Sequence, residues 1–208
     1  MVNFILVRHG TTEWIEANKI QGATDSPLSK KGRQEATWTA QALKAINFDG
    51  FFCSPIGRTV ETAQIIGKEI GKAPIVIDAL REMNFGIYEG KTYFDTPASA
   101  MHWWKKISLL TRILISQVTG ESIRSVRSRA VQSCNEIKKI CPNGQILIIS
   151  HGVILNYLIG CLLPKEKYDK IKPIHLQPCS MTEIGISASG RVELIRLNDL
   201  SHLSRKNS

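Results

Sequence analysis

A chain of 208 residues with 43% hydrophobic and 22% charged residues is ordinary for a soluble globular protein, and it can bury a core without disulfide or metal staples. We expect no membrane segment, because Lys105, Lys106 and Arg112 interrupt the nearest candidate, residues 103–118. The net charge of +9 favours anionic partners, but no aromatic RNP-like run or paired zinc ligands accompany it, so we expect a small anion as partner and no nucleic acid.

Short strand-like segments alternate with longer helix-like segments along the chain, with no repeat, linker or break in composition. This alternation predicts an α/β fold, a three-layer α/β/α sandwich with a mostly parallel central sheet, in one domain over residues 1–208. The expected strands are residues 3–7, 50–54, 74–78, 145–150, 181–187 and 191–197. The expected helices are residues 29–46, 55–70, 121–141 and 153–163.

Two local patterns make the helix predictions more specific. Ser54 followed by Pro55 is typical of an N-cap and a first helical residue, so the second helix is expected to begin there. The helical spacing of residues 121–141 predicts one inward face, made of Ile123, Val126, Ala130, Cys134 and Ile137.

Polar and charged residues follow four of the expected strands. Arg8 and His9 follow the first strand, Arg58 the second, Glu82 the third and His151 the fourth. Because ligands bind beyond the carboxyl ends of parallel strands, these side chains are expected to converge in one cleft. Taken singly, each is explained as a solvated residue at a loop or helix start, and Glu82 as an ion-pair partner of Arg81 or of a nearby lysine. That explanation is weakened because four separate segments would place these five side chains at the same edge of the sheet by chance.

The set of side chains suits a phosphate monoester. Arginine donates paired hydrogen bonds to phosphate oxygens, and backbone amides near Gly10 and Gly152 add donors where the backbone can approach closely. A neutral histidine nitrogen can attack phosphorus, and a carboxylic acid can protonate the leaving alcohol. Water attack assisted by the same carboxylate would complete hydrolysis, so we expect no metal and no cofactor.

The cysteines and the other motifs of the chain indicate no competing chemistry. There is no GxxxxGK[ST], HExxH, GxSxG or CxxC pattern. An odd number of cysteines, five, predicts reduced and mostly buried thiols in a cytoplasmic protein. The apolar start has no basic n-region and is interrupted early, so we expect no secretory signal.

Five sequence blocks carry a family resemblance. The opening "LVRHGTTEW" with "IQGATDSPLSKKGRQEA" resembles the phosphoglycerate mutase-like branch of the histidine phosphatase superfamily. "CSPIGRTVETA", "REMNFGIYEG", "GES" and "SHG" resemble its later blocks, in the family order and over nearly the whole chain. The resemblance implies the family fold and its chemistry through a phosphohistidine.

The resemblance also implies roles for individual residues. It makes His9 the phosphorylated nucleophile and Glu82 the proton donor, with Arg8, Arg58 and His151 around the phosphate. The implied substrate-binding residues are Arg8, Thr11, Gln21, Gly22, Arg58, His151 and Gly152. In one departure, Ile15 stands where relatives carry an asparagine that contacts the phosphate, so this polar contact is expected to be missing.

The resemblance implies a short helical insertion at about residues 91–120, over the active-site edge. Mutases of the family carry a longer insertion there, and "EMNFGIYEG" resembles the phosphatase version of its block, so hydrolysis of a small phosphorylated metabolite is predicted. The alternatives are a cofactor-dependent phosphoglycerate mutase and a catalytically idle phosphate-binding protein. A helical stripe in the insertion either packs on the domain or contacts an apolar part of the substrate; it consists of Trp103, Trp104, Ile107, Leu110 and Leu114.

Overall fold

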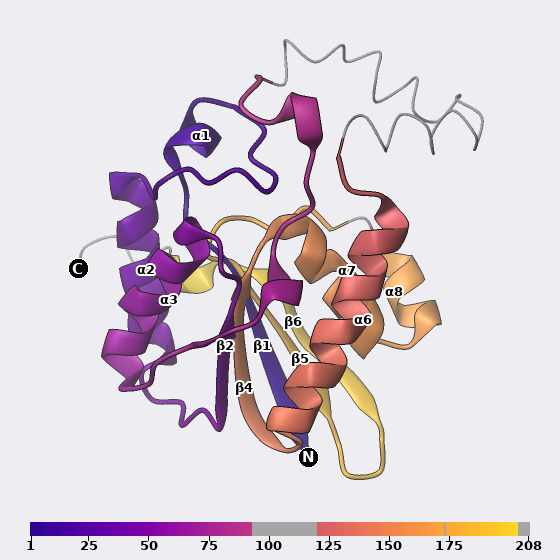
Figure 1. Ribbon diagram of the computed structural model, residues 1–208. Helices are drawn as coiled ribbons and strands as arrows, with labels where there is room; N and C mark the ends of the chain where they lie inside the picture. Colours follow the sequence, from indigo (N-terminus) through magenta and orange to yellow (C-terminus); the bar gives the residue numbers. More distant parts are fainter. Residues whose placement is uncertain (93–119, 173, 204–208) are drawn as a thin grey trace.

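In the computed structural model, which describes residues 1–92, 120–172 and 174–203, a six-stranded sheet lies between two layers of helices (Figure 1). The strand order is β3-β2-β4-β1-β5-β6. Strands β1 to β4 run parallel, β5 is antiparallel to β1, and β6 is antiparallel to β5. The predicted α/β fold with a mostly parallel sheet is therefore confirmed.

The elements follow the predicted order. The strands are β1 (Val2–Arg8), β2 (Gly50–Cys53), β3 (Ile75–Val76), β4 (Gly144–Ser150), β5 (Met181–Ile186) and β6 (Val192–Asp199). The helices are α1 (Glu13–Glu16), α2 (Lys30–Leu43), α3 (Gly57–Ile70), α6 (Ile123–Ile140), α7 (Gly152–Leu162) and α8 (Lys165–Ile171). Three short 3₁₀ helices are η1 (Asp78–Leu80), η2 (Gly86–Tyr88) and η3 (Ser201–Leu203). Helices α1 and α8 were not predicted, because neither has a buried face that would give it an apolar period.

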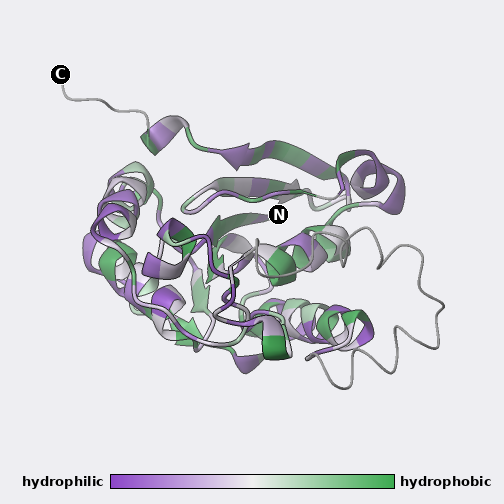
Figure 2. Cartoon of the chain, turned by 90° about the horizontal axis from the view of Figure 1, so that it is seen from above, coloured by the Kyte–Doolittle hydropathy of each residue, from purple (hydrophilic) through white to green (hydrophobic). Residues whose placement is uncertain are grey.

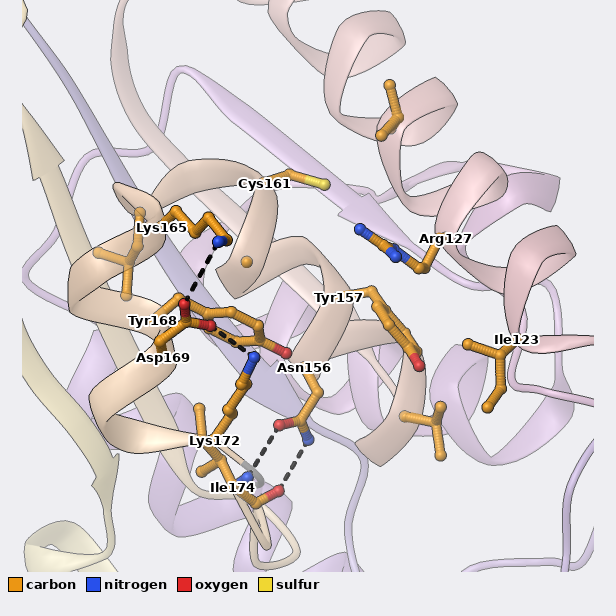
Figure 3. Close-up of a pocket in the computed structure, with 14 residues that line it drawn as sticks. Ile123, Arg127, Asn156, Tyr157, Cys161, Lys165, Tyr168, Asp169, Lys172 and Ile174 are labelled. Atoms are coloured by element: carbon orange, nitrogen blue, oxygen red, sulfur yellow. Dashed lines mark hydrogen bonds and ion pairs between the residues drawn. The ribbon is translucent and has the colours of Figure 1, made fainter. Parts of the chain in front are cut away.

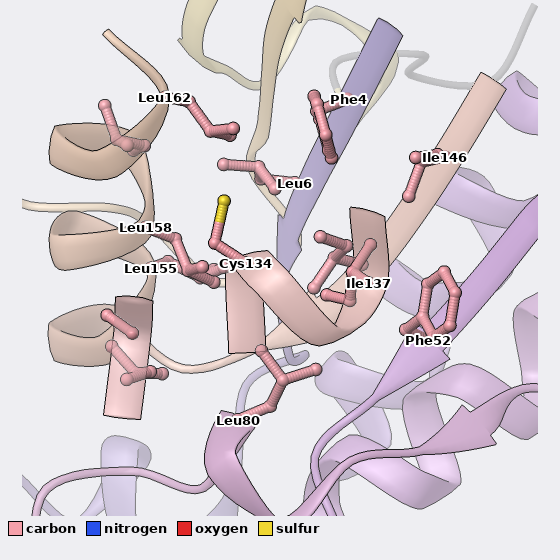
Figure 4. Packing of buried hydrophobic residues seen from close by; sticks show 14 of the residues in the cluster. Phe4, Leu6, Phe52, Leu80, Cys134, Ile137, Ile146, Leu155, Leu158 and Leu162 are labelled. Atoms are coloured by element: carbon pink, nitrogen blue, oxygen red, sulfur yellow. The ribbon is translucent and has the colours of Figure 1, made fainter. Parts of the chain in front are cut away.

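The core lies on both faces of the sheet. Alternate residues of β1 point to opposite faces, so Phe4 and Leu6 pack toward α6 and α7 whereas Ile5 and Val7 pack toward α2 and α3. Figure 4 shows the first of these layers, in which Ile137 of α6 lies among the side chains of the sheet and of α7. Seen from above, the helices carry apolar and polar residues side by side, as amphipathic helices do (Figure 2). Coverage of both faces explains why β1 and β4 are almost continuously apolar.

The start of α3 differs from the prediction. The helix begins at Gly57, and its N-cap, Ile56, has no side-chain cap. Ser54 lies outside the helix, and its Oγ is 2.7 Å from His151 Nε2. A carboxylate from another segment, Asp25, accepts the N–H of Arg58 at 3.1 Å in its place. The predicted helix start at Ser54 and Pro55 is therefore wrong. The Ser54 hydroxyl contacts His151 instead, and this contact joins the ends of β2 and β4.

One residue of the predicted inward face of α6 lies outward. Val126, Ala130, Cys134 and Ile137 are buried, but Ile123 is 50% exposed. Ile123 is the first residue of α6 and lines a groove beside α7 instead of the core. The helical spacing alone could not show that the first residue of α6 lies outside the core.

The predicted insertion lies almost entirely outside the described residues. This holds for its helical stripe, made of Trp103, Trp104, Ile107, Leu110 and Leu114. None of the helices in the described part of the chain has the length and apolar character needed to cross a membrane.

The core packing leads to a stability prediction for two isoleucines of α6. Ile137 is fully buried, so Ile137→Ala should lower the free energy of unfolding by about 2–5 kcal/mol, the usual cost of removing a buried isoleucine side chain. Ile140, in the same helix, is 50% exposed, and Ile140→Ala should cost about 1 kcal/mol or less. Urea unfolding of both variants measures the difference, and equal losses would contradict the described packing.

Candidate active site

A cleft of about 380 Å³ opens where β1 and β4 end and α3 and α7 begin. The predicted site residues that line it are Arg8, His9, Gln21, Gly22, Arg58, Glu82 and Gly152. His151 is fully buried next to His9, with 5.2 Å between the ring centroids and an edge-on arrangement. Four distant segments therefore bring the two histidines, the two arginines and the glutamate together, as the strand-end argument predicts.

His9 is held at the end of β1 with one ring nitrogen free of a proton. Its backbone N–H donates to the Ser150 carbonyl at 2.9 Å, which joins the ends of β1 and β4. Nδ1 lies 2.8 Å from the Gly10 carbonyl, and because a carbonyl only accepts, Nδ1 carries the proton in this contact. Nε2 accepts a hydrogen bond from Arg58 Nε at 3.3 Å. The arrangement leaves a lone pair on Nε2, directed at the cleft arginine.

The close approach of Gly10 to α2 requires a glycine after His9. A Cβ at Gly10 would lie 2.6 Å from the carbonyl oxygen of Gly32, at the start of α2. The turn after His9 therefore passes too close to α2 for any side chain.

Both histidines are neutral in the folded protein. Burial lowers the pKa of His9 well below its usual range, and the charges of Arg58 and Arg8 lower it further, against a smaller opposing contribution of the Gly10 carbonyl. Burial also lowers the pKa of His151, and the charges of Arg58, Arg8 and Arg129 lower it further. A neutral imidazole retains the lone pair that a nucleophile needs.

His151 has one ring nitrogen bound and one without a partner. Its Nε2 lies 2.7 Å from Ser54 Oγ and 3.4 Å from Thr59 Oγ1. Its Nδ1 is buried and has no hydrogen-bond partner within the described part of the chain. A buried nitrogen in this condition can form a hydrogen bond with a polar atom of a ligand.

Arg58 is the most enclosed cation of the cleft, at 1% exposure. Its Nη2 donates to the Gly22 carbonyl at 2.6 Å and its Nη1 to the Thr24 carbonyl at 2.8 Å. Asp25 lies 3.5 Å from Nη1 as a longer ion-pair partner. Arg8 is less buried, and its Nη1 donates to the Leu176 carbonyl at 2.6 Å. Two guanidinium groups from different elements thus face the same cleft.

Glu82 is buried at the N-terminus of α7. Oε1 accepts the N–H groups of Met83 at 2.9 Å and Ile154 at 3.2 Å, and Oε2 accepts that of Val153 at 3.0 Å. The first N–H groups of a helix have no partner within the helix, and this carboxylate satisfies two of them. The alternative that Glu82 pairs with Arg81 is wrong, since Arg81 forms its ion pair with Asp78.

The remaining predicted substrate residues lie in different environments. Gln21 lines the cleft, and its Oε1 accepts from Thr12 Oγ1 at 3.0 Å. Ile15 also lines the cleft, where the family resemblance suggested an asparagine. Thr11 is not brought to the cleft wall: it is buried, and both its N–H and its hydroxyl donate to Glu35, at 2.8 and 3.0 Å.

Sequence reasoning missed Arg129, which holds the segment that carries Glu82. Its guanidinium donates to the carbonyls of Ala79 at 2.9 Å and Arg81 at 2.8 Å. A bidentate ion pair with Glu121, at 2.7 and 2.6 Å, fixes the guanidinium. The available signal was a charged residue on the inward stripe of α6, next to Ala130. Such a residue is buried only when it is paired.

A second cavity, of about 900 Å³, lies between α6, α7 and α8 (Figure 3). It is lined by mixed side chains that include Arg127, Tyr157 and Tyr168, and none of the predicted site residues lines it. The larger cavity adjoins the cleft, because Val153, Asn156 and Ile174 line both. Within the described residues, no group of three or more His, Cys, Asp and Glu side chains is arranged to hold a metal ion.

Comparisons with known proteins identify the family of this chain. The profile of the histidine phosphatase superfamily (branch 1) matches residues 4–200. A probable phosphoglycerate mutase GpmB from Cronobacter sakazakii is 32% identical over 209 residues, which cover 98% of this chain and 95% of that protein.

Solved structures share the fold over nearly the whole chain. The phosphoglycerate mutase from Bacillus anthracis str. Sterne has a TM-score of 0.80 at 26% identity, covering 97% of this chain and 95% of its own. A mutant phosphoserine phosphatase from Entamoeba histolytica, in complex with phosphoserine, has a TM-score of 0.76 at 30% identity, covering 98% of this chain and all of its own (100%). The protein belongs to the histidine phosphatase superfamily, branch 1.

Proposed function

We propose that this protein is a phosphomonoester hydrolase that acts on a small phosphorylated metabolite through a phosphohistidine at His9. The observation that carries the proposal is the state of His9: a buried, neutral imidazole with its proton on Nδ1 and its Nε2 lone pair directed at Arg58. A phosphate oxygen that takes the place of Nε2 as acceptor for Arg58 Nε would free this lone pair for attack on phosphorus.

In the first step, His9 Nε2 forms a bond to phosphorus while the bond from phosphorus to the ester oxygen breaks. Arg8 and Arg58 bind the phosphate oxygens, and His151 Nδ1 supplies a third donor in the tautomer that carries its proton there. Glu82 gives a proton to the departing alcohol. Oε2 is the oxygen placed for this transfer. Among the described residues it accepts one hydrogen bond, from Val153, whereas Oε1 accepts two, and a Cβ built on Gly152 in the cleft lining would lie 3.9 Å from it.

In the second step, water attacks the phosphohistidine, and the Glu82 carboxylate takes a proton from that water. Inorganic phosphate leaves and His9 returns to its neutral form. Arg8 and Arg58 supply the cationic groups around the phosphate, so the proposed reaction needs no metal and no cofactor. We further propose that residues 1–208 act as one domain.

The phosphoglycerate mutase reaction is the second candidate, because the 32% identical relative is named a probable mutase whereas the 30% identical structure is a phosphatase. Both reactions would share the first step and differ in the acceptor, a second hydroxyl or water. The short segment between Gly90 and Gly120 supports hydrolysis, as does the phosphatase-like form of "EMNFGIYEG".

The central test concerns His9. Brief incubation with a phosphomonoester followed by an alkaline quench should leave an acid-labile phosphate on His9, and His9→Ala should abolish turnover. Assays with 3-phosphoglycerate, with and without 2,3-bisphosphoglycerate, separate phosphate release from mutase turnover. Full activity of a folded His9→Ala variant would exclude the proposed nucleophile.

A second prediction concerns Glu82 and the leaving group. An alkyl ester leaves as a poor alkoxide unless it is protonated, and general acid catalysis contributes about 10²- to 10⁴-fold. Glu82→Gln should therefore slow the burst of phosphoenzyme formation by that order for alkyl phosphates and only mildly for p-nitrophenyl phosphate. Rapid-quench measurement of the burst isolates the first step. Equal slowing of both esters would argue for a general loss of cleft geometry instead of an acid.

A third prediction follows from the neutral state of His9. Because burial and the arginines hold the pKa of His9 low in the folded chain, the unfolded chain binds more protons once the pH falls below about 6.5. The free energy of unfolding should then decrease as the pH is lowered below about 6.5. His9 should account for up to about 1.4 kcal/mol of this decrease per pH unit. Urea unfolding at pH 6.5 and 5.5 should show a correspondingly smaller fall for His9→Asn. The same pH dependence in both proteins would contradict the neutral assignment.

A further inference from the structure

Glu89, at the end of η2, holds a carboxylate that the proposed reaction does not use. Its Oε1 accepts the N–H groups of Ala23 and Phe85, both at 2.8 Å. Its Oε2 accepts the N–H of Thr24 at 2.8 Å and also the Thr24 hydroxyl. Both oxygens are therefore engaged, and three of the four donors are backbone N–H groups.

The loop bound by Glu89 also binds Arg58 from its opposite side. The Gly22 and Thr24 carbonyls accept the two terminal nitrogens of the guanidinium, at 2.6 and 2.8 Å. The backbone of this loop therefore binds both side chains: its N–H groups donate to the Glu89 carboxylate, and its carbonyls accept from the Arg58 guanidinium.

The loop packs so closely against the Glu89 carboxylate that no side chain fits between them at Gly22. Gly22 has a φ of +61°, which favours glycine, and a Cβ there would lie 2.1 Å from Glu89 Oε1. The neighbouring backbone is also paired, since Gly90 N–H donates to the Ile20 carbonyl at 2.8 Å and Ile20 N–H donates to the Lys91 carbonyl at 2.9 Å. A displacement of Glu89 would therefore be transmitted to the loop.

The same carboxylate reaches the segment of the proton donor. Phe85 follows Glu82 by three residues, and its N–H shares Oε1 with Ala23. One side chain thus joins two walls of the cleft, the loop at 21–24 and the segment at 82–89. A carboxylate suits this position because it offers acceptors only.

We infer that Glu89 is a positioning residue that fixes the Arg58 guanidinium for phosphate binding, by ordering the loop whose carbonyls hold Arg58. The inference rests on the proposed function in one respect, that the ligand of the cleft is a phosphate group. The terminal nitrogens of Arg58 keep their carbonyl partners while Nε exchanges His9 for a phosphate oxygen. Arg58 therefore needs a loop that stays in place when the ligand arrives.

The test is the affinity for inorganic phosphate, measured by calorimetry without turnover. In Glu89→Gln the amide nitrogen would face at least one backbone N–H in either orientation, so part of the loop would lose its acceptor. The Kd for phosphate and the KM for p-nitrophenyl phosphate should both rise by about tenfold, the effect of losing one hydrogen bond to a charged group. The matched control is Glu69→Gln, which removes a carboxylate that forms a surface ion pair with Lys44, and it should stay within about twofold of the unaltered chain.

A coupling measurement separates positioning from general destabilisation. If Glu89 acts through Arg58, Glu89→Gln should have little further effect on phosphate affinity in a chain that already carries Arg58→Lys. A folded Glu89→Gln variant with unchanged Kd, or an equal added loss in the Arg58→Lys background, would overturn the inference. Should Glu89→Gln not fold, Thr24→Val removes one contact at an exposed residue and should raise the Kd by about threefold. An unchanged Kd in that variant would overturn the inference as well.

The two proposals fail in different ways. A chain that binds phosphate but hydrolyses no ester overturns the proposed function, while the phosphate measurements on Glu89→Gln still decide the positioning role. A chain that does not bind phosphate overturns both.

Discussion

A guanidinium buried as completely as that of Arg58 needs an acceptor for its N–H groups, because an unpaired buried charge costs several kcal/mol. The acceptors come from the loop carbonyls of Gly22 and Thr24, from Asp25 and from His9 Nε2. The loop at 21–25, the start of α3 and the end of β1 are therefore tied to one side chain. The hydrogen bonds that this guanidinium needs therefore hold these three walls of the cleft together.

The same charge contributes to the state of the two histidines. Burial is the main reason that the pKa values of His9 and His151 are low, and the nearby Arg58 guanidinium disfavours the imidazolium further, so both rings are neutral in the folded chain. Under the proposed function, the positive charge that helps to keep the nucleophile neutral would also bind the phosphate dianion, and it is in place before the substrate arrives.

Carboxylates satisfy the backbone around this cationic centre. Glu35 accepts from Thr11, Glu82 from the first turn of α7, and Glu89 from the loop at 23–24. Loops that follow strands leave N–H groups without sheet partners, and a buried N–H needs an acceptor. Acidic residues from neighbouring elements supply these acceptors, and they also bring negative charge near the two arginines.

The sequence by itself determined the order of the six strands and of four of the helices, and it identified the two arginines, two histidines and one glutamate that meet at the ends of the strands. Apolar periodicity depends on local spacing, and the residue types that suit a phosphate group are few, so both could be predicted without coordinates. The tertiary structure decided which groups these side chains contact. Ser54 contacts His151 and does not cap α3, and Thr11 faces Glu35.

The protonation pattern of His9 and the positions of Glu89 and Arg129 were also decided only by the tertiary structure. The contacts of Glu89 and Arg129 join segments as much as about 65 residues apart in the chain, and no local pattern specifies which side chain meets which backbone group. A side chain's type limits which hydrogen bonds it can make, but only the packing of distant segments selects the partner that it actually reaches.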